Sequence, residues 1–154
     1  MKRKLRKRWL AFGAVLVLCT AVLLWPVPFA RYANTAEVCY VDILSWEPGA
    51  ATHRHSGDLP PEEARQVLSL LENGRLRWQG FCRSIVYSGQ TLYSFTLGHL
   101  EDGDYVQDAR FELLSDGSLY NVWYNVGYTC FRLENVDTEA LCRELDGLLA
   151  GDTV

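Results

Sequence analysis

Residues 91–114 read TLYSFTLGHLEDGDYVQDARFELL, and this stretch decides the fold. It predicts two antiparallel strands, 91–97 and 105–114, joined by an acidic turn around Gly103. Apolar and polar residues alternate along both strands, which indicates a sheet with one buried face. The side chains expected on that face are Tyr93, Phe95 and Leu97 from the first strand and Tyr105, Ala109, Phe111 and Leu113 from the second.

Further strands are predicted on both sides of this hairpin. Residues 115–118, Ser-Asp-Gly-Ser, carry an Asp-Gly turn signal and lead into a strand over 119–126. Gly127 predicts a bulge before a strand over 128–133. Upstream, residues 38–44 and 81–87 are β-branched or aromatic and predict two more strands. Residues 45–58 are rich in turn formers and predict a loop.

Two amphipathic helices complete the predicted domain. The first begins at Pro61 and ends at Asn73-Gly74, and its apolar stripe consists of Ala64, Val67, Leu68 and Leu71. The second follows Asp137, has leucines near one face, and ends at Gly151. The pattern predicts an α+β fold: an antiparallel β-meander sheet with both helices packed on one face.

The amino terminus predicts a single transmembrane helix before this domain. Six of the first eight residues are basic, and residues 9–29 carry no charge. A helix of that length reaches about 31 Å, which matches a hydrocarbon core of roughly 30 Å. The expected division is a cytoplasmic basic segment 1–8, an anchor 9–29, a linker 30–36 and an extracytoplasmic domain 37–154.

Three alternatives to an uncleaved anchor remain open. A cleaved signal peptide shares the basic start, but cleavage after Ala30 would place Pro28 at the −3 position. Lipidation at Cys19 would require a small residue where Leu18 stands. A buried helix of a soluble protein is the third alternative. Uncleaved, the chain is a signal-anchored, single-pass protein of the cell membrane with a cytoplasmic amino terminus.

The charge of the predicted domain narrows the class of partner, and its cysteines suggest disulfide bonds. Residues 31–154 contain nine arginines, no lysine and all 19 acidic residues, for a formal charge of −10, which disfavours nucleic acid. Cys39, Cys82, Cys130 and Cys142 are disulfide candidates in an oxidising compartment, with three possible pairings. The short separation favours Cys130 with Cys142, which would leave Cys39 to pair with Cys82, and four buried thiols are the alternative. The sequence contains no CxxC motif of the kind typical of zinc sites, and no cofactor is predicted.

Three groups of residues are candidate sites. Asn121, Trp123 and Asn125 share one side of a strand, and could bind a sugar or peptide if the side of Tyr120 is the core. His53 and His55 could contribute to a metal site or titrate as a pH sensor. The acidic turn 101–104 lacks the spacing of a calcium loop.

The layout resembles that of a known group of proteins. The basic start, the anchor, the helix within residues 58–78 (DLPPEEARQVLSLLENGRLRW) and the meander resemble small uncharacterised membrane- or lipid-anchored extracytoplasmic proteins of Gram-positive anaerobic bacteria. The resemblance implies a bacterial cell-surface setting and no particular activity.

The expected function is an interaction module rather than an enzyme. The chain contains no G-x-S-x-G, H-E-x-x-H or P-loop motif. We therefore expect a membrane-anchored domain that binds a protein or a cell-envelope component. The alternative is a metal- or pH-responsive envelope sensor that uses His53 and His55. A small hydrolase, with paired carboxylates drawn from Asp42, Glu47 and Glu112, ranks third.

Overall fold

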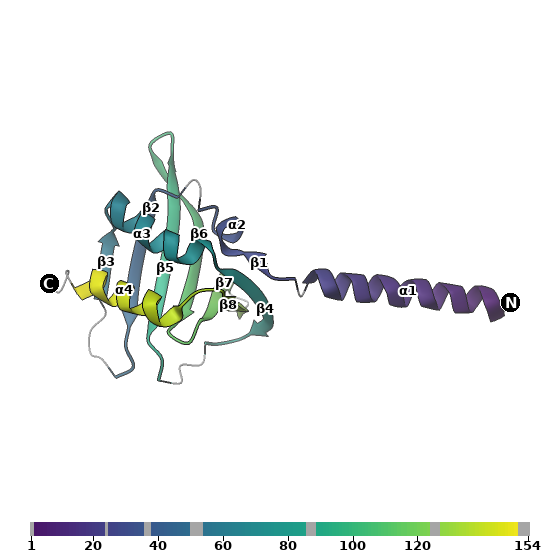
Figure 1. The fold of residues 1–154 in the computed structure, drawn as a ribbon. Helices are drawn as coiled ribbons and strands as arrows, with labels where there is room; N and C mark the ends of the chain where they lie inside the picture. Colours follow the sequence, from purple (N-terminus) through teal and green to yellow (C-terminus); the bar gives the residue numbers. More distant parts are fainter. Residues whose placement is uncertain are drawn as a thin grey trace.

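The computed structural model describes residues 2–23, 25–35, 38–49, 54–85, 89–123 and 127–150. A long helix extends from an α+β domain (Figure 1). The helices are α1 (Lys2–Leu23), α2 (Phe29–Tyr32), α3 (Pro61–Glu72) and α4 (Thr138–Ala150). The strands are β1 (Val27–Pro28), β2 (Tyr40–Trp46), β3 (Arg54–Asp58), β4 (Arg75–Cys82), β5 (Leu92–Glu101), β6 (Asp104–Leu114), β7 (Ser118–Trp123) and β8 (Gly127–Glu134).

The described strands form one antiparallel sheet. Their order is β1-β4-β8-β7-β6-β5-β2-β3, and every neighbouring pair runs antiparallel. Strands β5 to β8 follow one another as the predicted meander, because short turns let consecutive strands pair. The α+β class and the antiparallel sheet are therefore confirmed.

Helices α3 and α4 cover the same face of the sheet (Figure 1), as predicted. We call this the helix-covered face and the other the opposite face. The predicted stripe of α3 is buried, and so are Leu141, Leu145 and Leu149 of α4. Under the helices, the rings of Phe95 and Phe111 stack with centroids 4.8 Å apart. The remaining large side chains that are fully buried in this core include Ile43, Tyr93, Leu97, Leu113 and Leu119.

Residues 27–33 belong to the domain, which differs from the predicted anchor 9–29 and linker 30–36. The helix α1 ends at Leu23, and Pro26 and Pro28 prevent its continuation. Phe29 is fully buried, its ring lies 5.4 Å from that of Phe111, and its backbone N–H donates to the Gly74 carbonyl at 2.9 Å. The uncharged run therefore continues past the helix into the core. Among the described residues, no helix combines the length and the apolar content that a membrane crossing demands.

Gly74 is required by a close approach rather than by a left-handed conformation. The expected stop at Asn73-Gly74 is correct in position, but Asn73 is right-handed at φ −78°. A Cβ on Gly74 would lie 2.8 Å from Leu133 Cδ1 and 2.8 Å from the Leu71 carbonyl oxygen. The absence of a side chain thus lets the end of α3 pack against β8.

Three strand predictions are wrong in detail. Strand β4 covers Arg75–Cys82 rather than 81–87, and β3 lies inside the segment predicted as a loop. The pairing of β5 with β6 shifts between Leu97 and Gly98, so that one extra residue of β6 is accommodated. Tyr105 consequently lies on the opposite face, where its ring contacts that of Tyr40 at 4.4 Å, and not with Phe111 as expected.

Candidate functional site

The predicted binding surface on strand β7 depended on which side of the strand faces the core, and in the structure the other side faces it. Asn121 pairs with Phe111 and Thr129, both buried residues of the helix-covered face. Tyr120 pairs with Glu112 and lies on the opposite face. Asn121 is half-buried on the core side, so it cannot flank an open binding strip. The Trp123 side chain and residue Asn125 lie outside the described residues.

The predicted histidine site falls largely on residues that the structure does not describe. His53 is outside the described residues, and for His55 only the backbone is described, paired with Leu44. Within the described ranges, no three His, Cys, Asp or Glu side chains group closely enough to hold a metal. His99 lies elsewhere and places Nδ1 2.8 Å from Asp108 Oδ2.

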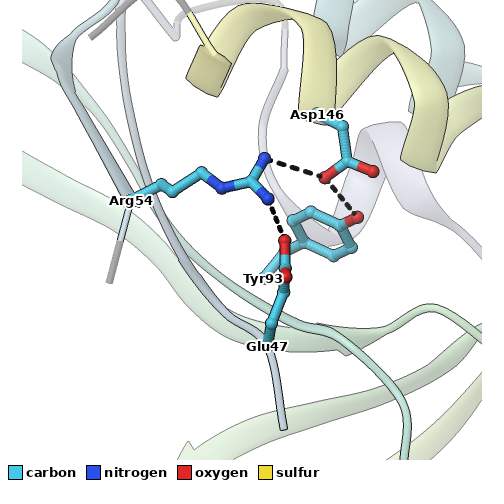
Figure 2. Close-up of polar contacts among 4 residues, drawn as sticks. All are labelled: Glu47, Arg54, Tyr93 and Asp146. Atoms are coloured by element: carbon cyan, nitrogen blue, oxygen red, sulfur yellow. Dashed lines mark hydrogen bonds and ion pairs between the residues drawn. The ribbon is translucent and has the colours of Figure 1, made fainter. Parts of the chain in front are cut away.

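A polar cluster joins the β2–β3 hairpin to α4 (Figure 2). The Arg54 guanidinium donates to Glu47 Oε1 and lies 4.0 Å from Asp146 Oδ1. The Tyr93 hydroxyl donates to the same Asp146 oxygen at 3.1 Å. Glu47 and Arg54 are seven positions apart, but Tyr93 and Asp146 lie far from them in the sequence, so neither spacing nor motif could have indicated the cluster.

The cluster is suited to holding α4 rather than to catalysis. Burial raises the pKa of Tyr93 well above its usual value, and the charges of Cys142 and Asp146 raise it further. Tyr93 therefore remains a neutral hydrogen-bond donor under the helix. Arg54 lies between two carboxylates whose combined negative charge exceeds its own, so the cluster presents no unbalanced cation to an anionic ligand.

A hollow of about 680 Å³ lies between α2, the start of β2 and α3. Most of the side chains that line it are small or aliphatic, and Arg65 and Glu72 of α3 add two charged groups. A small-molecule site usually converges several polar groups on an apolar pocket. Of the predicted site residues, the disulfide candidate Cys39 lines the hollow, whose chemistry points to no ligand class.

The opposite face carries a strip of exposed apolar side chains. Leu44 and Trp46 alternate with the buried Ile43 and Ser45 along β2, and are 39% and 46% exposed. At the other end, Leu100 pairs with Tyr105, and they are 55% and 57% exposed. We call these four residues (Leu44, Trp46, Leu100 and Tyr105), together with the half-buried Tyr40 whose ring contacts that of Tyr105, the aromatic strip. Sequence reasoning missed it because residues 45–58 were read as loop and Tyr105 was assigned to the core.

Glu112 is the most perturbed acid on the opposite face. It lies in register between Ser94 and Tyr120, and its Oε2 is buried without a hydrogen-bond partner among the described residues. Burial raises the pKa of Glu112, and the nearby Arg110 charge only partly offsets this effect. Of the three carboxylates in the hydrolase hypothesis, Glu47 is engaged by Arg54 beside α4.

Cys82 and Cys130 are the cysteines that the structure brings together. Their Sγ atoms are 2.6 Å apart. Burial, together with the side-chain hydrogen bond and the charge interaction with Cys82, raises the pKa of the Cys130 thiol to about 12. The separation along the sequence had favoured Cys130 with Cys142 instead. That reasoning failed because Cys142 packs from α4 onto the helix-covered face, whereas Cys130 pairs with Tyr120 on the opposite face.

No family model matches this chain, and no curated protein or solved structure shows significant similarity to it. A function must therefore be argued from the chain's own surfaces and side chains.

Proposed function

We propose that this protein is a membrane-anchored interaction module, in which α1 attaches the chain to the bilayer. The domain then lies outside the cytoplasm and binds a protein or another component of the cell envelope. The observation that carries this proposal is the exposed apolar surface of α1, which extends away from the domain (Figure 1). The exposed apolar side chains are Trp9, Phe12, Val15, Leu16, Val17 and Leu18, at 58–69% exposure.

Lipid is the occupant that best accounts for this surface. Each buried methylene group gains about 0.8 kcal/mol on leaving water, and these side chains are largely exposed in the structure. The uncharged part of α1, from Trp9 to Leu23, reaches about 22 Å. This is shorter than a hydrocarbon core of roughly 30 Å, and bilayers adapt to short spans by local thinning. The basic residues before Trp9 favour a cytoplasmic amino terminus.

The part of the domain beside α1 supports the same orientation. Trp25 and Phe81 are 72% and 74% exposed, and they line an apolar hollow of about 360 Å³ with Val27 and Trp78. Arg31 and Arg75 line an adjoining hollow together with Trp25. Tryptophan rings and arginines favour the headgroup region of a bilayer. An acidic domain that presents these residues beside its helix is suited to resting on a membrane.

The aromatic strip is the surface that we assign to the partner. It lies on the face that α3 and α4 leave uncovered, and its members come from β2, β5 and β6. Aromatic residues are enriched where proteins bind one another, since they bury large areas with few rotatable bonds.

Site-specific photo-crosslinking of the full chain in its native membrane tests the proposal. A photoreactive amino acid at Trp46 or Tyr105 should capture one recurrent partner. The same group at Arg65 or Glu139, exposed on α3 and α4, is the matched control and should not capture it. Capture that is equal at all four positions, or capture at none, would contradict the assignment of the strip.

Membrane attachment has its own test in cell fractionation. The full chain should remain in the membrane pellet through an alkaline carbonate wash, because an inserted apolar helix resists extraction. Replacing Leu16 and Leu18 with arginine places two charges in the proposed lipid-facing segment and should release the protein. An unmodified chain that appears in the carbonate supernatant would refute the anchor.

A further inference from the structure

The register of β4 and β8 sets Cys82 and Cys130 side by side. Gly80 pairs with Cys130 and Cys82 pairs with Tyr128, so the two cysteines are diagonal neighbours on the same face. Their Sγ atoms are 2.6 Å apart, and a disulfide bond is about 2.05 Å long. Small side-chain rotations would therefore join them without moving either strand.

Close packing of the two strands holds this arrangement in place. Gly127, at the start of β8, has φ +129°, and a Cβ there would lie 2.5 Å from the Cys82 carbonyl oxygen. A glycine is therefore needed for the end of β4 to approach β8 so closely. The proximity of the two cysteines follows from the backbone as well as from their side chains.

The other two exported cysteines are placed differently. Cys39 is exposed ahead of β2, and its backbone N–H donates to the Gly98 carbonyl. Cys142 packs from α4 against the core on the helix-covered face. The sheet itself separates Cys142 from the Cys82–Cys130 pair. Of the three possible pairings, only one contains two cysteines that already touch.

We propose that Cys82 and Cys130 form a disulfide bond when the chain meets a disulfide donor, and that Cys39 and Cys142 remain thiols. One thiolate of the pair attacks a sulfur of the donor and displaces the first donor thiolate. The second cysteine, once deprotonated, attacks the mixed disulfide and displaces the other. The cysteine pair is oxidised, the donor disulfide is reduced to two thiols, and the two cysteine protons balance the released thiolates.

The bond would secure a part of the sheet that has few other supports. Strand β1 pairs with Leu76 and Arg75, so among the described strands the far end of β4 is bordered by β8 alone. The pairing of β4 with β8 is also irregular between Trp78 and Gly80. Phe81, which belongs to the surface beside α1, precedes Cys82 directly. The disulfide would thus fix the position of the proposed membrane-facing aromatic residues.

Tryptic peptide mapping of the full chain tests this pairing. Each exported cysteine lies on a separate peptide: Cys39 on 32–54, Cys82 on 78–83, Cys130 on 111–132 and Cys142 on 133–143. After purification in detergent under reducing conditions, the protein is treated with oxidised glutathione and its free thiols are alkylated. Peptides 78–83 and 111–132 should be recovered linked, and 32–54 and 133–143 should carry the alkyl label.

Serine variants provide the controls. Cys82→Ser or Cys130→Ser should abolish the linked peptide, whereas Cys39→Ser and Cys142→Ser should leave its yield unchanged. Recovery of 111–132 linked to 133–143, or of four fully alkylated peptides after oxidation, would overturn the inference.

Formation of the bond in cells also rests on the proposed location outside the cytoplasm, and a second measurement separates the two claims. Thiols are trapped with acid in intact cells and then mapped in the same way. Linked peptides both in vitro and in cells support the pairing and the location. A link that forms in vitro but is absent from cells supports the pairing and contradicts the location. Absence of the link in vitro contradicts the pairing wherever the protein resides.

Discussion

Replacing Phe29 with alanine distinguishes a core residue from a residue of an anchor or linker. Phe29 is fully buried, and its ring lies 5.4 Å from Phe111 and 6.1 Å from Tyr32. Truncating a phenylalanine in a packed core costs about 3–5 kcal/mol, through lost burial and the cavity left behind. A domain of this size is stable by about 5–15 kcal/mol, so the change removes a large share.

The assay is urea unfolding of the full chain in detergent micelles, followed by near-ultraviolet circular dichroism. With a urea dependence of ~1–3 kcal/mol per molar, Phe29→Ala should lower the unfolding midpoint by at least about 1 M. The matched control is Phe12→Ala on α1, where the side chain is 63% exposed and the midpoint should not move. If both variants unfold at the wild-type midpoint, residues 27–33 are not part of the core and the reasoning from burial is refuted.

Three further perturbations follow from the polar groups and the cysteines. Tyr93→Phe removes the hydrogen bond to Asp146, and should destabilise the domain by about 1 kcal/mol in the same urea assay, whereas no change would show that the bond is absent. Burial raises the folded pKa of Glu112 above its ordinary 4.5, so its contribution to stability is full below pH 4.5 and is lost as the pH rises through the folded pKa. Glu112→Gln should therefore stabilise the domain at neutral pH and flatten this part of the stability–pH curve, and a destabilised variant would contradict that sign. Reducing a Cys82–Cys130 bond, whose ends are 48 positions apart, should cost about 4 kcal/mol on a chain-entropy model, and equal midpoints with and without reductant would argue against that cross-link.

The meander and the two helices could be predicted because their apolar residues recur at the spacing that places them on one buried face. Phe95 and Phe111 are flanked by polar residues on both sides, and the stripe of α3 recurs at helical spacing. Strand β3 could not be predicted this way. It is a short, polar strand that pairs with β2 at the edge of the described sheet, so its hydrogen bonds depend on a neighbour and not on its own composition.

The candidate sites were harder to predict because they depend on which side of a strand is buried. Strand β7 has apolar side chains on both sides, Leu119 on one and Tyr120 on the other, so alternation alone left the choice open. Leu119 lies on the same side of the strand as Asn121 and is fully buried. An aliphatic residue at this position is the sequence signal that could have identified the buried side. Tyr105 was misplaced because the irregular pairing at Leu97 and Gly98 changes the phase of β6, and no residue type announces that change.

The burial of Phe29 also limits how the domain can move relative to α1. Only residues 24–26 separate the end of α1 from β1, and three residues span at most about 10 Å. Immediately beyond them the chain is fastened to Gly74 and inserted between aromatic rings. The connection therefore limits how far the domain can lie from the end of the helix. If α1 is the anchor proposed above, this short connection keeps the domain, and any partner bound to the aromatic strip, close to the end of the helix.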